Sequence, residues 1–259
     1  MIEMEDALVQ ICHNKLKEYP CFEYQRLSHE EPMIYYTKEE YRDWAKSYGI
    51  EQMLGDDFVR SMAKISQLVH RLVPFGNKKV IEPCRYNGFE LLDYCKKGYG
   101  LNCTGYSIIL NDILLSLGIK SRCVWCLSYN HPFDNECHAV NQVFDAQKRM
   151  WMIVDAAFGC IPLVDEQGID IITLRNAIRE NKELAFRKLN KNHDAAFANR
   201  YRRYMTKNTF MFLTLKTSGL YYDTENEAIL VIPEGFERNC VSDYNYPYFI
   251  TKNAFFLER

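Results

Sequence analysis

The 259-residue sequence lacks long hydrophobic runs and long runs of charge of one sign. No stretch approaches the roughly 18 uncharged apolar residues of a bilayer-spanning segment, so no spanning helix is expected. The formal net charge is −2, from 32 Lys and Arg against 34 Asp and Glu. This balance disfavours partners that are held by bulk charge. We therefore expect neither a nucleic acid nor a membrane surface as a partner.

The N-terminus also lacks the parts of a secretion signal. The segment "MIEMEDALVQICHNKLKEY" is acidic and amphipathic, and it has no basic start, apolar core or small-residue cleavage site. These absences favour a cytoplasmic protein. In a reducing compartment most of the 10 cysteines should remain thiols, so few or no disulfides are expected.

Motifs for metal binding are equally scarce. Cys123 and Cys126 form a CxxC, but no second CxxC or HxxxH accompanies it. They lie in "IKSRCVWCLS", which is typical of a strand, where residues three apart point to opposite faces. Two core cysteines are therefore favoured over a zinc site. No EF-hand calcium loop is present, and no metal or other cofactor is expected.

The order of the predicted elements indicates an α+β fold. The first hundred residues favour helices, and Thr37 and Glu40 have the spacing of a capping box at the start of the second one, which Gly49 can end. The predicted helices of this part cover 4–19, 37–49, 56–73 and 87–97.

A nearly enclosed helix is predicted in "GYGLNCTGYSIILNDILLSLGI" (98–119). Its apolar residues recur at helical spacing from Tyr106 to Leu117, and Gly118 suits the position after the helix end. The helix should begin at or just after Cys103. A potentially reactive thiol would then lie at the mouth of a buried helix.

Shorter segments rich in β-branched and aromatic residues follow and predict strands. Strands are expected at 119–128, 137–144, 149–156, 210–216 and 228–235, and further helices at 173–180 and 194–206. Helices followed by an antiparallel sheet, with no repeats and no low-complexity linker, favour one domain over 1–259. Its parts are a helical region (1–97), a catalytic core (98–160) and C-terminal helices and strands (161–259).

Two of these strands flank the polar turn "DAQKR". If the turn is centred between Ala146 and Gln147, His138 faces Asp155 on the neighbouring strand. Directly opposed residues share a face of the sheet, with their Cβ atoms about 5 Å apart. A slip of one residue would place the two side chains on opposite faces, so this pairing depends on the register.

Cys103, His138 and Asp155 together have the chemistry of a cysteine acyl-transfer site. The positive end of a helix and a neighbouring imidazolium both favour thiolate over thiol. A carboxylate on the far nitrogen fixes the tautomer of the imidazole and stabilises its positive form. The remaining histidines fit less well, because they lie in predicted helices or in loops. They include His13, His70, His131 and His193.

A helix N-terminus also offers backbone donors to an oxyanion. We expect the backbone N–H of Cys103 to serve in this way. A donor from a side chain is left open among Tyr86, Asn87 and Asn102.

The segments "LNCTGYSIILNDILLSLGIKSRCV", "CHAVNQVF" and "WMIVDAAFG" resemble the transglutaminase-like superfamily, over about 98–160. The resemblance implies a papain-like fold in which a cysteine-bearing helix packs on an antiparallel sheet. It implies that Cys103 is the nucleophile, His138 the general acid/base and Asp155 its orienting partner. A looser likeness to uncharacterised bacterial transglutaminase-like proteins extends through "YRRYMTKNTFMF" to "VIPEGFE".

Two details depart from related patterns. "DAAFG" replaces the "DPT"-like continuation after the aspartate, and the "RGGxC" approach of arylamine N-acetyltransferases is absent, with "GLNC" in its place. The resemblance implies cysteine-dependent acyl transfer or amide hydrolysis through a thioester. The partners would be a peptide or a small acyl or amide substrate, with an amine or water as acceptor. The alternative is a non-catalytic binding or scaffold module on the same fold.

Overall fold

The computed structural model describes residues 6–22, 34–76, 81–131, 137–188, 196–219, 222, 228–236 and 249–251. The α-helices are α1 (Asp6–Glu18), α2 (Glu39–Ser47), α3 (Phe58–Leu72), α4 (Gly88–Lys96), α5 (Cys103–Ser116), α6 (Ile171–Arg179) and α7 (Phe197–Asn208), and the short 3₁₀ helices are η1 (Ile50–Met53) and η2 (Pro83–Arg85). The strands are β1 (Ile34–Tyr35), β2 (Ser121–Leu127), β3 (Cys137–Asp145), β4 (Met150–Val154), β5 (Cys160–Val164), β6 (Gln167–Gly168), β7 (Ala185–Lys188), β8 (Met211–Leu215), β9 (Thr217–Ser218), β10 (Ala228–Val231) and β11 (Phe249–Thr251).

A six-stranded sheet forms the centre of the fold, in the order β11-β10-β8-β2-β3-β4. Every neighbouring pair in it is antiparallel except β10 and β11. A smaller sheet joins β6, β5 and β7, and β1 pairs with β9. The α+β fold predicted from the sequence is therefore confirmed.

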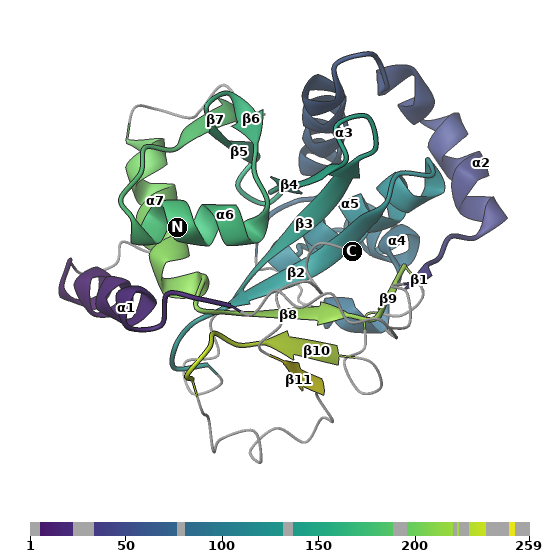
Figure 1. Ribbon diagram of the computed structural model, residues 1–259. Helices are drawn as coiled ribbons and strands as arrows, with labels where there is room; N and C mark the ends of the chain where they lie inside the picture. Colours follow the sequence, from purple (N-terminus) through teal and green to yellow (C-terminus); the bar gives the residue numbers. More distant parts are fainter. Residues whose placement is uncertain are drawn as a thin grey trace.

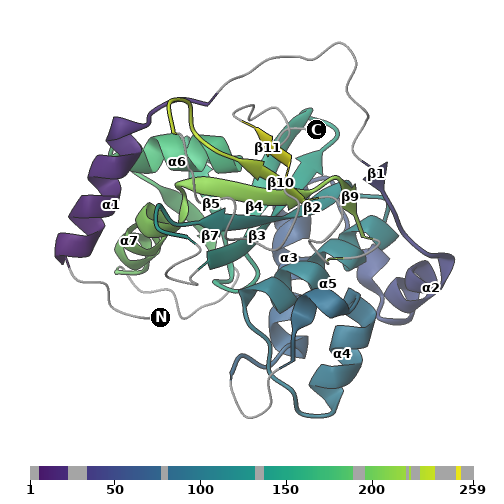
Figure 2. The ribbon, with the colours of Figure 1, turned by 90° about the horizontal axis from the view of Figure 1, so that it is seen from below.

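Helices cover both faces of the central sheet. In the two views α3, α4 and α5 lie on one side of it, and α6 and α7 lie on the other (Figure 1, Figure 2). Side chains tie α5 to β3: the Ser107 hydroxyl donates to the Val140 carbonyl at 3.1 Å, and the Asn141 amide donates to the Ser107 carbonyl at 3.0 Å. On the opposite face, the first N–H of α6, from Ile171, donates to the Gln142 side chain at 3.0 Å.

The helix α5 has the enclosed position that its sequence predicts. Every residue from Thr104 to Ser116 is buried. Asn102 is the N-cap, and its side chain accepts a hydrogen bond from the Gly105 N–H at 3.2 Å. Gly118 follows the helix with φ of +75°, a conformation that glycine adopts without strain. The helix therefore begins at Cys103, as expected.

Side chains cap the starts of α3, α4 and α6, whereas the starts of α2 and α7 have no side-chain cap. Asp57 caps α3, and Asn87 caps α4 in a capping box with Glu90. The capping box predicted at Thr37 is wrong, because α2 begins one residue later. Its N-cap is Lys38, whose carbonyl accepts from the Tyr41 N–H at 3.0 Å, and no side chain caps this end.

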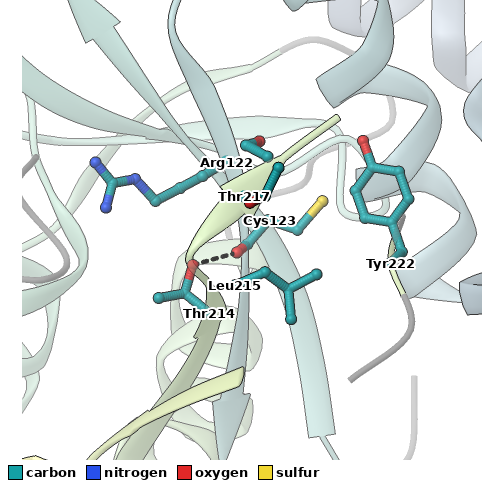
Figure 3. Close-up of a pocket in the computed structure, with 7 residues that line it drawn as sticks. Arg122, Cys123, Thr214, Leu215, Thr217 and Tyr222 are labelled. Atoms are coloured by element: carbon teal, nitrogen blue, oxygen red, sulfur yellow. Dashed lines mark hydrogen bonds between the residues drawn. The ribbon is translucent and has the colours of Figure 1, made fainter. Parts of the chain in front are cut away.

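The two cysteines of the CxxC occupy opposite faces of β2, as predicted. Cys123 pairs with Asn141 and Cys126 with His138, and both cysteines are buried free thiols whose pKa burial raises. Around Cys123 the side chains leave no room for a water molecule, and the Thr214 hydroxyl donates to the Cys123 carbonyl at 3.0 Å (Figure 3). Across the described ranges, His, Cys, Asp and Glu side chains nowhere gather in threes that could hold a metal ion.

None of the helices in the described part of the chain combines the length and the apolar character needed to cross a bilayer.

Candidate active site

The three residues singled out by sequence meet in one place. The imidazole of His138 hydrogen-bonds the sulfur of Cys103, and its Nε2 lies 2.7 Å from Oδ2 of Asp155. Since Asp155 takes Nε2, Nδ1 is the ring nitrogen left for the thiol. His138 and Asp155 are fully buried, whereas Cys103 keeps part of its surface in solvent. The nucleophile is thus the accessible end of a buried relay.

The observed register of the hairpin formed by β3 and β4 differs from the predicted one. Gln142 faces Ile153 and Asp145 faces Met150, so the hairpin is shifted by two residues. The loop is longer than assumed because the Asp145 side chain accepts from two loop N–H groups, at 3.0 and 3.2 Å, and Arg149 adopts φ of +55°. Directly opposite pairing of His138 with Asp155 is therefore wrong.

A shift of two residues preserves the face of each side chain, which is why the contact survives. Asp155 reaches His138 diagonally rather than straight across the ladder. It lies just beyond β4, in an isolated bridge with Cys160 whose two backbone hydrogen bonds measure 2.9 and 3.0 Å. Its Oδ1 accepts from the Phe158 N–H at 2.9 Å. The "DAAFG" segment thus forms a turn that fixes the carboxylate.

The divergence of β4 also makes room for the nucleophile. β3 pairs with β4 only from Asn141 onward, so the first residues of β3 extend past the end of β4. There the Cys103 sulfur lies 3.9 Å from the Cys137 carbonyl and accepts a hydrogen bond from the Ala139 N–H. The start of α5 therefore meets the sheet at its edge, where the imidazole of His138 can contact the thiol.

The site favours a negative sulfur and a positive ring. Burial opposes the thiolate, but the hydrogen bond and charge of His138, together with the Ala139 N–H, lower the pKa of Cys103. Burial likewise opposes a charged imidazole, yet the charge and hydrogen bond of Asp155, followed by those of Cys103, raise the pKa of His138 to about 10. Opposite shifts of two partners in contact stabilise the thiolate–imidazolium pair.

Part of the chain is similar to a known protein family. Residues 52–156 match the sequence model described as the Transglutaminase-like superfamily. Residues 52–156 are a transglutaminase-like core. No curated protein and no solved structure matches the chain.

The transglutaminase-like core contains α3, α4 and α5 as well as β2 to β4. The match therefore begins well before residue 98, where the sequence motifs begin. It includes all three candidate catalytic residues and ends one residue after Asp155.

Aromatic side chains enclose the buried part of the site. The rings of Phe158 and Tyr204 meet the His138 ring edge-on, with centroids 4.8 and 5.4 Å away. Behind them the buried hydroxyl of Tyr201 lies near Asp155, and burial together with the carboxylate charge raises the tyrosine pKa. Phe158 and Tyr204 lie outside the matched region, so the C-terminal part of the chain completes the wall around the transglutaminase-like core.

Three supporting groups of the core were missed from the sequence. They are the Ala139 N–H, the Trp125 indole and His70. Trp125 donates to the Thr104 hydroxyl at 3.2 Å and so holds the first turn of α5. His70, on α3, lies with Nδ1 3.2 Å from the carbonyl of Ala156, next to Asp155. A carbonyl can only accept, so Nδ1 carries the proton. No local motif marks these contacts, because each joins segments distant in sequence.

Two of the side-chain candidates for an oxyanion donor cap helices through their oxygens. The Asn87 oxygen caps α4 and the Asn102 oxygen caps α5, which leaves the amide NH₂ of each able to donate. The ring of Tyr86 packs against Tyr94, with centroids 4.9 Å apart. The helix start also provides backbone donors, because N–H groups of the first turn have no acceptor within the helix.

His13 and His131 are not part of the site. Nε2 of His13, on α1, lies 3.0 Å from the carbonyl of Arg179. The backbone N–H of His131 bonds the Ser128 carbonyl at 3.3 Å. His193 lies outside the described residues.

Proposed function

We propose that the protein is a cysteine acyltransferase or amide hydrolase that forms a thioester on Cys103. The observation that carries this proposal is the relay from Cys103 through His138 to Asp155, with the 2.7 Å contact at its buried end. The two reacting groups have the electrostatic states that the reaction needs: a sulfur biased toward thiolate and a ring biased toward imidazolium.

In the first half-reaction, the Cys103 thiolate adds to the carbonyl carbon of the acyl donor. The N–H groups at the start of α5, those of Cys103 and Thr104, would stabilise the oxyanion. As the tetrahedral adduct collapses, the imidazolium of His138 gives its proton to the leaving amine. The bond from carbon to nitrogen breaks, and the acyl group remains on sulfur as a thioester.

In the second half-reaction, the neutral His138 accepts a proton from an amine or from water as it attacks the thioester. The carbon–sulfur bond then breaks and the thiolate returns, paired again with imidazolium. Asp155 holds the ring in the tautomer that both steps use, because Nε2 remains bonded to it throughout. The donor is a peptide or a small acyl or amide compound, and the acceptor determines whether the result is transfer or hydrolysis.

Acylation can be tested with p-nitrophenyl acetate, an activated donor that needs no specific leaving-group pocket. We expect a burst of p-nitrophenolate equal to the protein concentration, and an acetyl group on Cys103 in the intact protein and its peptides. Cys103→Ala should abolish both signals. Cys21→Ala, which removes an exposed thiol, serves as the matched control and should keep them.

An acetyl group that still forms in Cys103→Ala, or no burst in the wild-type protein, would contradict the proposal and favour a non-catalytic binding module. Adding a primary amine during turnover then separates the two reactions. Acetylated amine would indicate transfer, and acetate alone would indicate hydrolysis.

A further inference from the structure

We propose that Phe75 forms an apolar subsite beside Cys103, and that the natural acyl donor carries an aromatic or large aliphatic group close to its reacting carbonyl. This inference rests on the proposed function and adds the class of donor to it.

The first observation is the exposure of the Phe75 side chain. It is 72% exposed, the largest value among the exposed large hydrophobic residues in the described part of the chain. Single exposed apolar residues are common on soluble proteins, so exposure alone does not mark a site. The position of Phe75 and the rigidity of its backbone distinguish it from the others.

Phe75 lies directly beside the segment that leads into the nucleophile. Its backbone forms a parallel bridge with Leu101, two residues before Cys103, and the Leu101 N–H donates to the Pro74 carbonyl at 3.2 Å. Each bridged residue has a glycine beside it, Gly76 after Phe75 and Gly100 before Leu101, and a Cβ on Gly100 would lie 1.6 Å from the Gly76 carbonyl oxygen. The two segments can approach so closely only because position 100 has no side chain.

The Phe75 segment is also fixed to α5 itself. The Tyr106 hydroxyl, one turn beyond Cys103, donates to the Val73 carbonyl at 2.7 Å. The rings of Tyr106 and Phe75 are in contact, with centroids 6.3 Å apart. Phe75 is therefore held on a firmly positioned backbone next to the helix start, while its ring faces solvent.

In this position the exposed ring of Phe75 can contact a bound substrate and be removed from water by it. A donor bound with its carbonyl at Cys103 has the adjoining part of its chain close to the Phe75 side of the helix start. An apolar group there would be removed from water against the ring, and a pre-positioned ring loses little conformational freedom on binding. An anionic group there would gain nothing from the ring, whose face is negative.

The subsite can be tested without knowing the natural substrate. Iodoacetamide and N-phenyl iodoacetamide carry the same reactive carbon, and only the second has an aromatic group beside the carbonyl. We expect Cys103 to react faster with N-phenyl iodoacetamide than with iodoacetamide, after correction for the ratio measured with free cysteine. In Phe75→Ser this preference should fall about tenfold, a typical effect of losing apolar contact in a pocket. Phe75→Leu should retain part of it.

The rate with iodoacetamide itself should not change in either variant, because it reports the state of the Cys103 thiolate. Ile11→Ser is the matched control, because Ile11 is an exposed apolar residue on α1 (58% exposed). That variant should keep the wild-type preference.

Three results would overturn the subsite: no aromatic preference in the wild-type protein, an unchanged preference in Phe75→Ser, or an equal loss of both rates in Phe75→Ser and Phe75→Leu. The last would mean that Phe75 only supports the fold. Failure of the proposed function has a different signature, since Cys103 would then react with both reagents no faster than Cys21.

Discussion

Two buried carboxylates, Asp155 and Asp112, differ in the groups that surround them. Asp155 accepts from the Phe158 N–H and lies against His138, which can carry a positive charge. Asp112, on α5, accepts from the Gly88 N–H at 2.7 Å and from the Tyr222 hydroxyl, which are neutral donors. Both carboxylates are almost completely removed from solvent.

The difference shows how the partner decides what a buried carboxylate does. Beside Asp155 the imidazole gains affinity for its proton, and the pKa of His138 rises to about 10. At Asp112 burial outweighs the two hydrogen bonds and raises the pKa of that carboxyl to about 7. Asp155 therefore supports charge on a neighbour, whereas Asp112 joins α5 to α4 and Tyr222 and serves the fold. Substitution of Asp155 should affect the rate of acylation, and substitution of Asp112 should affect the free energy of unfolding.

The largest effect is expected from His138→Ala, which removes both the partner of the thiolate and the proton donor. The rate constant for acylation by p-nitrophenyl acetate should fall by about 10⁶-fold, as for the histidine of comparable triads. Stopped-flow measurement of the burst gives this constant. His13→Ala, which changes a histidine on α1, should leave it within twofold of wild type. A His138→Ala variant that keeps its burst would remove His138 from the mechanism.

Asp155→Ala should have a smaller effect, because both reacting groups remain and only the orientation and tautomer of the ring are lost. A fall of about 10⁴-fold in the same constant is expected. The double variant His138→Ala/Asp155→Ala should be about as slow as His138→Ala alone, because Asp155 acts through the ring. Independent, multiplicative losses in the double variant would show that Asp155 acts by another route.

Asp112→Asn should instead reduce the free energy of unfolding, by about 1–3 kcal/mol at pH 5, because an amide NH₂ would face one of the two donors. The raised pKa means that the folded protein holds a proton that the unfolded chain releases near pH 4. This contribution is complete below that pH and is lost as the pH rises through about 7. The cost of the substitution should therefore be smaller at pH 8 than at pH 5.

Urea unfolding at both pH values measures this cost. Asp57→Asn is the matched control, because Asp57 is an exposed N-cap of α3 and Asn caps helices about as well as Asp. It should change stability by only a few tenths of a kcal/mol. If the cost of Asp112→Asn grows between pH 5 and pH 8, the carboxyl is not held in its neutral form.

The smallest effect is expected at His70, which supports the turn after Asp155 through the Ala156 carbonyl. His70→Leu removes one hydrogen bond of about 1 kcal/mol and should slow acylation about five- to tenfold. His70→Asn places an amide donor near the former Nδ1 and should restore most of the rate. Equal rates in the Leu and Asn variants would show that the ring, rather than its hydrogen bond, matters.

Much of the fold could be predicted from local patterns. The start of α5 at Cys103 follows from the Asn102 cap and the apolar spacing, and Gly118 marks its end. The alternation of β2 places Cys123 and Cys126 on opposite faces. These features depend on neighbours in sequence, so the sequence contains their cause.

The candidate site was predicted from a register of the β3–β4 hairpin that was wrong by two residues. The loop after Asp145 is longer than assumed, because the Asp145 side chain caps it and Arg149 accepts a left-handed conformation. A two-residue error keeps the face, so His138 and Asp155 were still brought together. The edge position of Cys103, the Ala139 N–H and the support from His70 could not be predicted. They depend on where β4 leaves the sheet and on how α3 packs.

The central claim is that His138 and the start of α5 hold Cys103 as a thiolate, and the most direct measurement is the rate of its alkylation by iodoacetamide at pH 8 and pH 6. A thiol with an ordinary pKa of about 8.5 would slow roughly 75-fold between these pH values. Quantifying labelled Cys103 and Cys21 peptides in one digest provides an internal reference. We predict a far smaller decrease at Cys103 in the wild-type protein and a steep decrease in His138→Ala. A wild-type Cys103 that slows as an ordinary thiol does would contradict the account.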